Sequence, residues 1–293
     1  MLLYLAPLPI CLAGLGWGWT SAATAALVGT LLLGGVFGAS VGAIFAGTIA
    51  IPITTLCYLA LLSRLPAAPQ GQATGALEWY PIGRLVGWAA IIAGAIVSLG
   101  ILMTGYNADS LGESMRELFK QGAFKDLDPN GTLINESSIG GLSNVLVWLF
   151  PAFSAILWQS IALFNLWLAG VIIETSERAL RPWPKLDAIE LPNAFFLAFT
   201  ASLIAAFLPG TAGLVAIAFA GALFLAYVLQ GLAVLHAFSR GMPFRGLLLA
   251  AVYIGIVLLA WPAIAVVILG LAEPMLRLRE RAAARGQPPS PPD

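Results

Sequence analysis

Nine runs of apolar residues, separated by polar, glycine- or proline-containing breaks, dominate the hydropathy pattern of the chain. They cover about residues 2–16, 18–37, 39–62, 85–105, 145–173, 192–208, 212–237, 246–260 and 263–276. A helix needs about 20 apolar residues to cross the hydrocarbon core of a bilayer. None of the runs alternates between apolar and polar positions, as membrane β-strands do. We therefore predict an all-α fold, a polytopic transmembrane helical bundle of about eight to nine membrane segments.

Glycine and proline mark the boundaries between neighbouring segments. Gly16-Trp17-Gly18 and Pro209-Gly210 each predict a tight turn. Trp261-Pro262 interrupts an apolar stretch that would otherwise form one helix from Leu247 to Leu271. Proline removes a backbone hydrogen bond and clashes with the preceding turn, so this break is either a kink or a hairpin.

The basic residues distinguish these two alternatives, because cytoplasmic loops are enriched in Lys and Arg. A hairpin at Pro262 places most of the 14 basic residues on one side of the membrane, namely Arg64, Arg84, Arg178, Arg181, Lys185, Arg240, Arg245, Arg277, Arg279, Arg281 and Arg285. The remaining three, Arg116, Lys120 and Lys125, lie in one polar segment. A kink would move the four C-terminal arginines to the other side and remove the asymmetry. We therefore predict a hairpin and a cytoplasmic C-terminus.

The first segment has no basic flank and is short for a membrane span. It does not resemble a cleavable signal peptide, which begins with a charged region. Two alternatives stay open: it is a short, partly buried helix, or the recorded start omits an upstream helix.

Hydropathy divides the chain into four parts. Residues 1–105 and 145–277 hold the N-terminal and C-terminal transmembrane helices. Residues 106–144 form an external polar insertion, and 278–293 are expected to be a disordered cytoplasmic tail. In the insertion, apolar residues recur at helical spacing opposite charged ones, which predicts an interfacial amphipathic helix followed by a loop rich in Gly, Asn and Ser. The apolar positions are Leu111, Met115, Leu118 and Phe119.

Composition agrees with a membrane protein and excludes a soluble one. Apolar residues make up 60% of the chain, charged residues 10%, and the mean hydropathy is +0.92. Soluble domains carry about 25% charged residues, which they need to cover their surface. The 14 basic and 14 acidic residues balance, so net charge does not suggest a nucleic-acid partner.

The sequence offers little that could support catalysis. His236 is the only histidine, and Cys11 and Cys57 lie inside apolar runs without the spacing of a redox or metal motif. No ionisable residue occupies the centre of a segment, which disfavours a proton-driven pump. We expect neither an enzyme nor a cofactor or metal.

Uncharged polar residues inside the segments are the strongest site candidates. Ser154, Trp158 and Asn165 fall on one stripe of a helix, and Tyr227 and Gln230 share a face of another. Buried amides either hydrogen-bond helices together or line a polar or aromatic cavity. Asn165 and Gln230 are expected to lie in the protein interior in both cases. The candidate ligand-binding set is Trp158, Asn165, Tyr227 and Gln230.

The order of several short motifs supports a family resemblance. These are Leu5-Ala6-Pro7-Leu8-Pro9-Ile10, Ala13-Gly14-Leu15-Gly16-Trp17-Gly18, Glu78-Trp79-Tyr80-Pro81, Asn165-Leu166-Trp167-Leu168-Ala169-Gly170, Leu191-Pro192-Asn193 and Gln230-Gly231-Leu232-Ala233-Val234. Together they resemble the YybS-like family of bacterial inner-membrane proteins, over about residues 5–280. The resemblance implies a multi-pass protein of the bacterial inner (plasma) membrane.

The N-terminal Leu-Pro-Ile…Gly…Gly stretch is also similar to the S components of energy-coupling-factor vitamin transporters, over about 35 residues. This resemblance implies a small-molecule ligand, and energising partner subunits, because the chain has no ATP-binding signature. Our leading hypothesis is a membrane-embedded small-molecule binding or transport component. The alternative is a non-enzymatic scaffold or regulator of envelope proteins, and a membrane enzyme is the weakest of the three.

Overall fold

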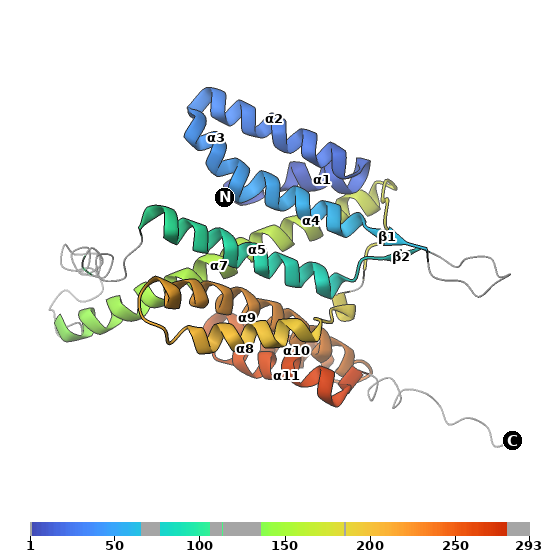
Figure 1. Ribbon diagram of the computed structural model, residues 1–293. Coiled ribbons are helices and arrows are strands. Elements are labelled where there is room, and N and C mark those ends of the chain that lie inside the picture. Colours follow the sequence, from blue (N-terminus) through green and yellow to red (C-terminus); the bar gives the residue numbers. More distant parts are fainter. Residues whose placement is uncertain (1, 66–76, 106–112, 114–135, 185, 280–293) are drawn as a thin grey trace, which may run out of the picture. The chain divides into compact units, whose positions relative to one another are not determined.

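The computed structural model describes residues 2–65, 77–105, 113, 136–184 and 186–279, and its helices are shown in Figure 1. The helices are η1 (Leu2–Leu5), α1 (Leu8–Trp17), α2 (Trp19–Phe37), α3 (Ala39–Phe45), η2 (Ala46–Ala50), α4 (Ile51–Leu61), α5 (Ile82–Thr104), α7 (Glu136–Thr175), η4 (Leu186–Ala188), α8 (Asn193–Ala205), α9 (Thr211–Phe238), α10 (Arg245–Leu259) and α11 (Pro262–Leu276). The only strands among the described residues are β1 (Ser63–Arg64) and β2 (Glu78–Trp79). The all-α fold is confirmed.

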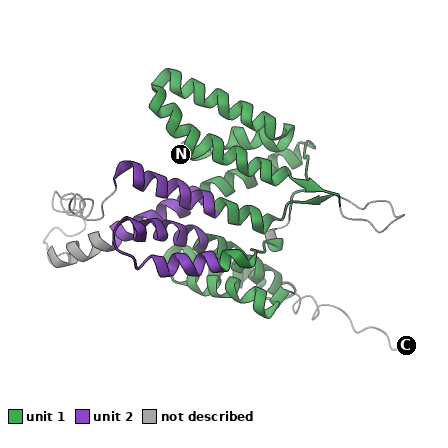
Figure 2. Ribbon diagram, in the orientation of Figure 1, with its two compact units in different colours: residues 1–89, 161–196, 224–293 green, residues 90–160, 197–223 purple. Residues whose placement is uncertain are grey.

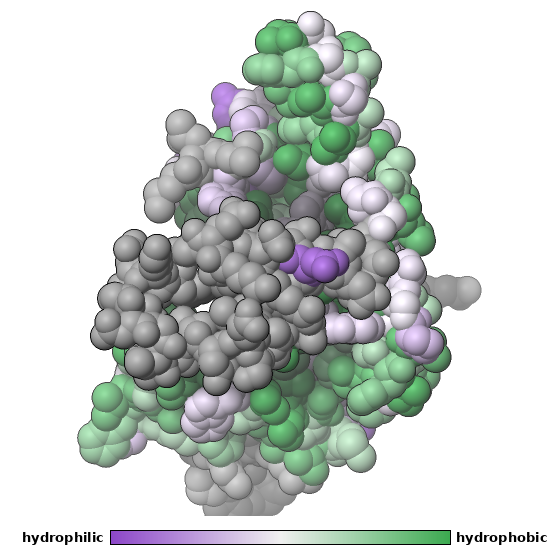
Figure 3. Space-filling model, turned by 90° about the vertical axis from the view of Figure 1, so that its left-hand side faces the viewer, coloured by the Kyte–Doolittle hydropathy of each residue, from purple (hydrophilic) through white to green (hydrophobic). Residues whose placement is uncertain are grey.

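Five helical stretches of the described chain are long and apolar enough to cross a bilayer: Trp19–Phe37, Ala39–Leu61, Ile82–Thr104, Val145–Thr175 and Thr211–Phe238. The shorter apolar helices are α1, α8, α10 and α11. Large apolar side chains are exposed on many of these helices, and Figure 3 shows a mostly hydrophobic surface on the described part of one face. Such a surface suits contact with lipid.

The predicted segments agree with the helices to within a few residues, apart from the start of α7. This helix begins at Glu136 rather than near residue 145, so the end of the predicted polar loop is helical. Hydropathy identifies only the apolar part of a helix. The backbone hydrogen bonds of a helix can continue into a polar stretch that hydropathy does not identify. The predicted amphipathic helix and the tail beyond residue 279 lie outside the described residues.

The chain forms two compact units built from interleaved segments (Figure 2). Unit 1 comprises residues 1–89, 161–196 and 224–293, and unit 2 comprises residues 90–160 and 197–223.

In unit 1, small residues allow the first helices to pack closely. A Cβ at Gly14 of α1 would lie 2.9 Å from the Cys57 Cβ and 3.0 Å from the Ala22 Cβ. Gly38, with φ +101°, makes the turn between α2 and α3, and a Cβ at Gly42 would lie 2.8 Å from the Gly34 Cα. α1 is a short helix with four buried residues, as one of the two alternatives for the first segment predicted.

The helix from Ala39 to Leu61 contains one wider turn. Ala46–Ala50 is π-helical and is followed directly by α4, whose second residue is Pro52. Because proline has no N–H and its ring crowds the preceding turn, a local widening accommodates it without ending the helix.

The break at Trp261-Pro262 ends one helix and starts another, since Ala260 adopts φ +58° and Pro262 is the first residue of α11. Asp187, on η4, forms an ion pair with Arg240 after α9 and accepts a 2.9 Å hydrogen bond at its carbonyl from Arg279 beyond α11. α10 and α11 have 15 residues each, about 22 Å of helix. A merely kinked helix would carry Arg279 about 40 Å away from Arg240, so the hairpin is confirmed.

In unit 2, glycines again mark close helix approaches. A Cβ at Gly94 of α5 would lie 2.4 Å from the Phe219 ring, and a Cβ at Gly221 of α9 would lie 2.6 Å from the Ala152 Cα of α7. Gly210, with φ +67°, makes the predicted turn before α9.

Candidate functional site

Gln230 of α9 is fully buried and binds two separate parts of unit 1. Its Oε1 accepts a 2.7 Å hydrogen bond from the Leu191 amide, and its Nε2 donates a 2.7 Å hydrogen bond to the Gly270 carbonyl of α11. The helices meet there backbone to backbone, because a Cβ at Gly231 would lie 1.9 Å from the Val266 carbonyl oxygen. The amide therefore has the arrangement expected of a helix-joining residue.

Asn165 of α7 is also fully buried, and it ties the N-terminal turn to that helix. Its Nδ2 donates 2.8 Å hydrogen bonds to the carbonyls of Tyr4 and of Ile161. Its Oδ1 has no hydrogen-bond partner among the described residues. The prediction that Asn165 and Gln230 lie in the interior is confirmed, but the two amides bind different partners.

The other two predicted site residues lie in different units. Tyr227 is 2% exposed and lies on α9 three residues before Gln230, in unit 1. Trp158 is half-buried on α7 and belongs to unit 2. The assignment of the four residues to one ligand site therefore stays a prediction.

Unit 2 contains a cavity of about 620 Å³ between α5 and α7. It is lined by Val97, Gly100, Ile101, Thr104, Leu146, Val147, Phe150, Pro151, Phe153 and Ser154. The α5 residues follow helical spacing and share one face of that helix. The walls are apolar apart from two hydroxyl groups, so the cavity can hold an apolar body with few polar contacts.

The two hydroxyl groups of this cavity differ in their hydrogen bonding. Thr104 Oγ1 donates a 2.7 Å hydrogen bond to the Gly100 carbonyl of its own helix. No hydrogen bond joins the Ser154 hydroxyl to any residue that the structure describes. Ser154 belongs to the predicted polar stripe, and Trp158 lies four residues further along the same helix face. The sequence shows this stripe but gives no sign of the apolar helix that faces it.

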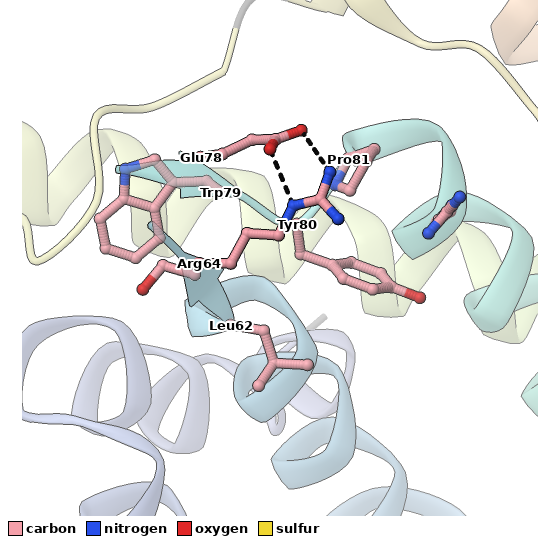
Figure 4. Close-up of a pocket in the computed structure, with 8 residues that line it drawn as sticks. Leu62, Arg64, Glu78, Trp79, Tyr80 and Pro81 are labelled. Carbon is pink, nitrogen blue, oxygen red and sulfur yellow. Dashed lines mark hydrogen bonds and ion pairs between the residues drawn. The ribbon is translucent and has the colours of Figure 1, made fainter. Parts of the chain in front are cut away.

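A second, smaller pocket of about 440 Å³ lies in unit 1 beside β1 and β2. Its lining residues are Leu62, Ser63, Arg64, Glu78, Trp79, Tyr80, Pro81 and Arg84 (Figure 4). The strands pair in antiparallel register, Ser63 with Trp79 and Arg64 with Glu78. This register places the Arg64 and Glu78 side chains next to each other on one face of the ribbon.

Arg64 and Glu78 form a bidentate ion pair. Arg64 Nε lies 2.8 Å from Glu78 Oε2, and Arg64 Nη2 lies 3.0 Å from Oε1. These hydrogen bonds, and the charge of Arg64, lower the pKa of the Glu78 carboxyl. They raise the pKa of Arg64 in return. At neutral pH, Glu78 therefore cancels the charge of Arg64.

Arg181 connects the wall of this pocket to the segment that follows α7. Its Nη1 donates a 2.7 Å hydrogen bond to the Ala60 carbonyl, and its Nη2 donates a 2.9 Å hydrogen bond to the Tyr80 carbonyl. Its guanidinium also lies over the Trp79 ring, 5.9 Å from the centroid. Burial lowers the pKa of Arg181. In the sequence, Arg181 is one of several basic residues of a polar loop, and this position gives no sign that the side chain is buried.

The basic loops of unit 1 meet at one end of its helices. Arg181 holds the end of α4 and β2 beside the segment after α7, and Asp187 holds the ends of α9 and α11. Arg178, three residues before Arg181, lies over the Trp17 ring. These basic residues thus lie at the same end of the helices of unit 1, and the side of the membrane that this end faces stays a prediction.

No metal-binding cluster occurs among the described residues. They include no group of three or more His, Cys, Asp or Glu side chains close enough to hold a metal ion. His236 Nε2 lies 2.9 Å from the Tyr253 hydroxyl. Cys11 and Cys57 are free and buried.

A family model described as predicted membrane protein (DUF2232) matches residues 1–273. No curated protein and no solved structure matches the chain.

Proposed function

The chain belongs to the DUF2232 family of predicted membrane proteins, and we propose that it is a non-enzymatic membrane component that binds or transports a small molecule. The observation that carries this proposal is the 620 Å³ cavity of unit 2. Its volume falls within the range of about 300–1,000 Å³ typical of small-molecule sites.

The lining of the cavity indicates the class of ligand. Apolar side chains form nearly the whole wall, and Ser154 contributes one hydroxyl without a partner among the described residues. A ligand with an apolar body and one polar group suits this lining, because it buries apolar surface and satisfies the hydroxyl. Trp158, four residues along the same face of α7, is the nearest of the four predicted site residues in sequence. Asn165 and Gln230 act as helix-joining residues in this proposal.

The positions of the basic residues support one orientation of the chain in the membrane. Arg84 lies in the first turn of α5, and the cavity residues Gly100 and Thr104 lie in its last turns. With the basic end in the cytoplasm of a bacterial cell, as the distribution of Lys and Arg favours, the cavity lies toward the outer face of the inner membrane. The C-terminus is then cytoplasmic.

Transport against a gradient would require partner subunits. The sequence has no ATP-binding signature and no ionisable residue at the centre of a segment, so nothing in the chain supplies the energy. The resemblance of the N-terminal stretch to S components agrees with a division of labour between a binding subunit and an energising one. The YybS-like resemblance agrees with the same membrane location.

The experiment that tests the proposal is untargeted mass spectrometry of the molecules that copurify with the protein in detergent. An unrelated multi-pass protein, purified in the same detergent, is the control. We expect at least one apolar or amphiphilic molecule to be enriched near one per chain over the control. Recovery of the same bulk lipids in the same proportions from both proteins would contradict the proposal.

A further inference from the structure

The pocket beside β1 and β2 lies at the end of two membrane-length helices. Ala39–Leu61 and Ile82–Thr104 each contain 23 residues, about 35 Å of helix, against a hydrocarbon core of about 30 Å. The pocket residues Leu62 to Arg64 follow the first helix directly, and Glu78 to Arg84 lead into the second. In a bilayer spanned by these two helices, their lengths would place the pocket at the depth of the lipid headgroups.

The pocket carries more positive than negative charge. Glu78 neutralises Arg64, as the bidentate pair in Figure 4 shows. Arg84 is exposed, and no hydrogen bond or ion pair joins its side chain to any residue within the described ranges. Arg181 is buried directly behind the wall, bound to the Tyr80 carbonyl, and no carboxylate of the described chain pairs with it. Arg84 and Arg181 thus lack a counter-charge among the residues that the structure describes.

Aromatic side chains give this pocket a fixed wall. Figure 4 shows the Trp79 and Tyr80 side chains on either side of Arg64. Trp88 Nε1 donates a 3.0 Å hydrogen bond to the Tyr80 hydroxyl, and Arg181 packs over the Trp79 ring. Tryptophan and tyrosine concentrate at membrane interfaces, where their rings contact the upper part of the lipid chains.

We infer that this pocket binds a phosphate-bearing anion, with Arg84 as its direct cationic contact and Trp79 and Tyr80 as its walls. Membrane depth favours the headgroup of an anionic phospholipid as the source of that phosphate. Arg181 adds to the positive potential from behind the wall. Glu78 limits affinity, because it occupies the guanidinium of Arg64 that would otherwise face the anion.

Native mass spectrometry of the full chain in detergent tests this inference through the population of one-to-one adducts. The three probes are phosphatidylglycerol, phosphatidylcholine and inorganic phosphate. We expect preferential retention of phosphatidylglycerol over phosphatidylcholine. If inorganic phosphate displaces the lipid at millimolar concentration, the pocket is a phosphate site for soluble anions. If it does not, the source is the lipid. Either result supports the phosphate site.

Three variants locate the binding. Arg84→Gln should weaken retention of phosphatidylglycerol about fivefold, the contribution of one basic residue near anionic lipid. Arg245→Gln is the matched control, since it removes an exposed arginine at the start of α10, outside the pocket. It should change retention by less than about twofold, because exposed charges outside the site are screened.

Glu78→Gln gives a result that misfolding cannot imitate. It releases Arg64 from its carboxylate partner, and retention of phosphatidylglycerol should rise about fivefold. Equal retention of the anionic and zwitterionic lipids by the wild-type protein would overturn the inference. So would equal losses in Arg84→Gln and Arg245→Gln, or a fall in retention for Glu78→Gln.

Discussion

Asp187 forms an ion pair with Arg240, and this contact joins η4 to the end of α9. The carbonyl of the same aspartate accepts a hydrogen bond from Arg279, which follows α11. The ends of α9 and α11 are thus held at one loop, so the chain must reverse between them. The Ala260–Trp261 turn is where it does so. In the sequence, Arg240 and Arg279 indicated only the membrane topology. In the structure they hold the ends of these two helices together.

The grouping of basic residues predicts which ends of the helices face the cytoplasm. In a background that lacks Cys11 and Cys57, Ser176→Cys probes the exposed basic end and Thr211→Cys probes the exposed start of α9. An impermeant maleimide should label Thr211→Cys in intact cells, and Ser176→Cys only after the membrane is opened. Labelling of Ser176→Cys in intact cells would reverse the proposed orientation.

Substitution by methionine should change the stability of the protein in opposite directions at Gln230 and Gln159. Gln230→Met removes two hydrogen bonds to backbone groups and should lower the free energy of unfolding by about 0.6–2 kcal/mol. Gln159 is fully buried, and neither its Nε2 nor its Oε1 has a partner among the described residues. Gln159→Met should therefore raise stability by about 1 kcal/mol, because it removes an unsatisfied polar group.

The measurement is the unfolding of each variant in detergent as a denaturing detergent is added. Circular dichroism follows the loss of helix, and the unfolding free energies of the two variants are compared. Destabilisation of similar size in both would show that Gln159 has partners that the hydrogen-bond pattern lacks.

The crossing of α9 and α11 depends on glycine. Gly231→Ala would place a Cβ 1.9 Å from the Val266 carbonyl oxygen, so the two helices must separate, and we expect a loss of about 1–3 kcal/mol, as in overpacked cores. Gly246→Ala in α10 is the control, because a Cβ there meets nothing within 4 Å. Melting temperature in detergent is the measurement. A Gly231→Ala protein as stable as Gly246→Ala would refute close backbone contact.

The two hydrogen bonds that Arg181 donates to backbone carbonyls require a guanidinium group and not only a positive charge. Arg181→Lys keeps the charge but cannot reach the carbonyls of Ala60 and Tyr80 with the same planar fork. We expect a loss of about 1–3 kcal/mol in unfolding free energy, because buried carbonyls lose their donors. Arg178→Lys serves as the control, since Arg178 is exposed and contacts the Trp17 ring. Equal melting temperatures for the two variants would show that the hydrogen bonds of Arg181 do not stabilise the protein.

Hydropathy and charge predicted the helices, the turn at Gly210 and the hairpin at Pro262, because each depends on residues close in sequence. They predicted that Asn165 and Gln230 are buried, because an exposed amide in hydrocarbon leaves its donors unsatisfied. They could not predict the partners. Asn165 binds Tyr4, 161 residues away, and only the packing of whole helices brings such groups together.

The cavity of unit 2 could not be predicted from the sequence, because it too depends on how distant helices pack. Ser154 and Trp158 showed a polar stripe on α7, but a cavity needs a second wall. The apolar face of α5 that supplies it looks, in sequence, like any face in contact with lipid. Gly100 on that face was not a candidate because glycine brings no chemical group to a site.

Gly100 offers the most direct test of small-molecule binding in this cavity. A Cβ at Gly100 meets nothing within 4 Å, so Gly100→Leu should fill part of the space without disturbing the helices. Gly35→Leu, at an exposed glycine of α2 with the same open surroundings, is the matched control. The measurement is the amount per chain of the molecule that copurifies with the wild-type protein, together with the melting temperature of each variant. We predict that Gly100→Leu loses most of this molecule and Gly35→Leu retains it, with both proteins folded. Equal amounts of the molecule in folded Gly100→Leu and Gly35→Leu would contradict binding in the cavity.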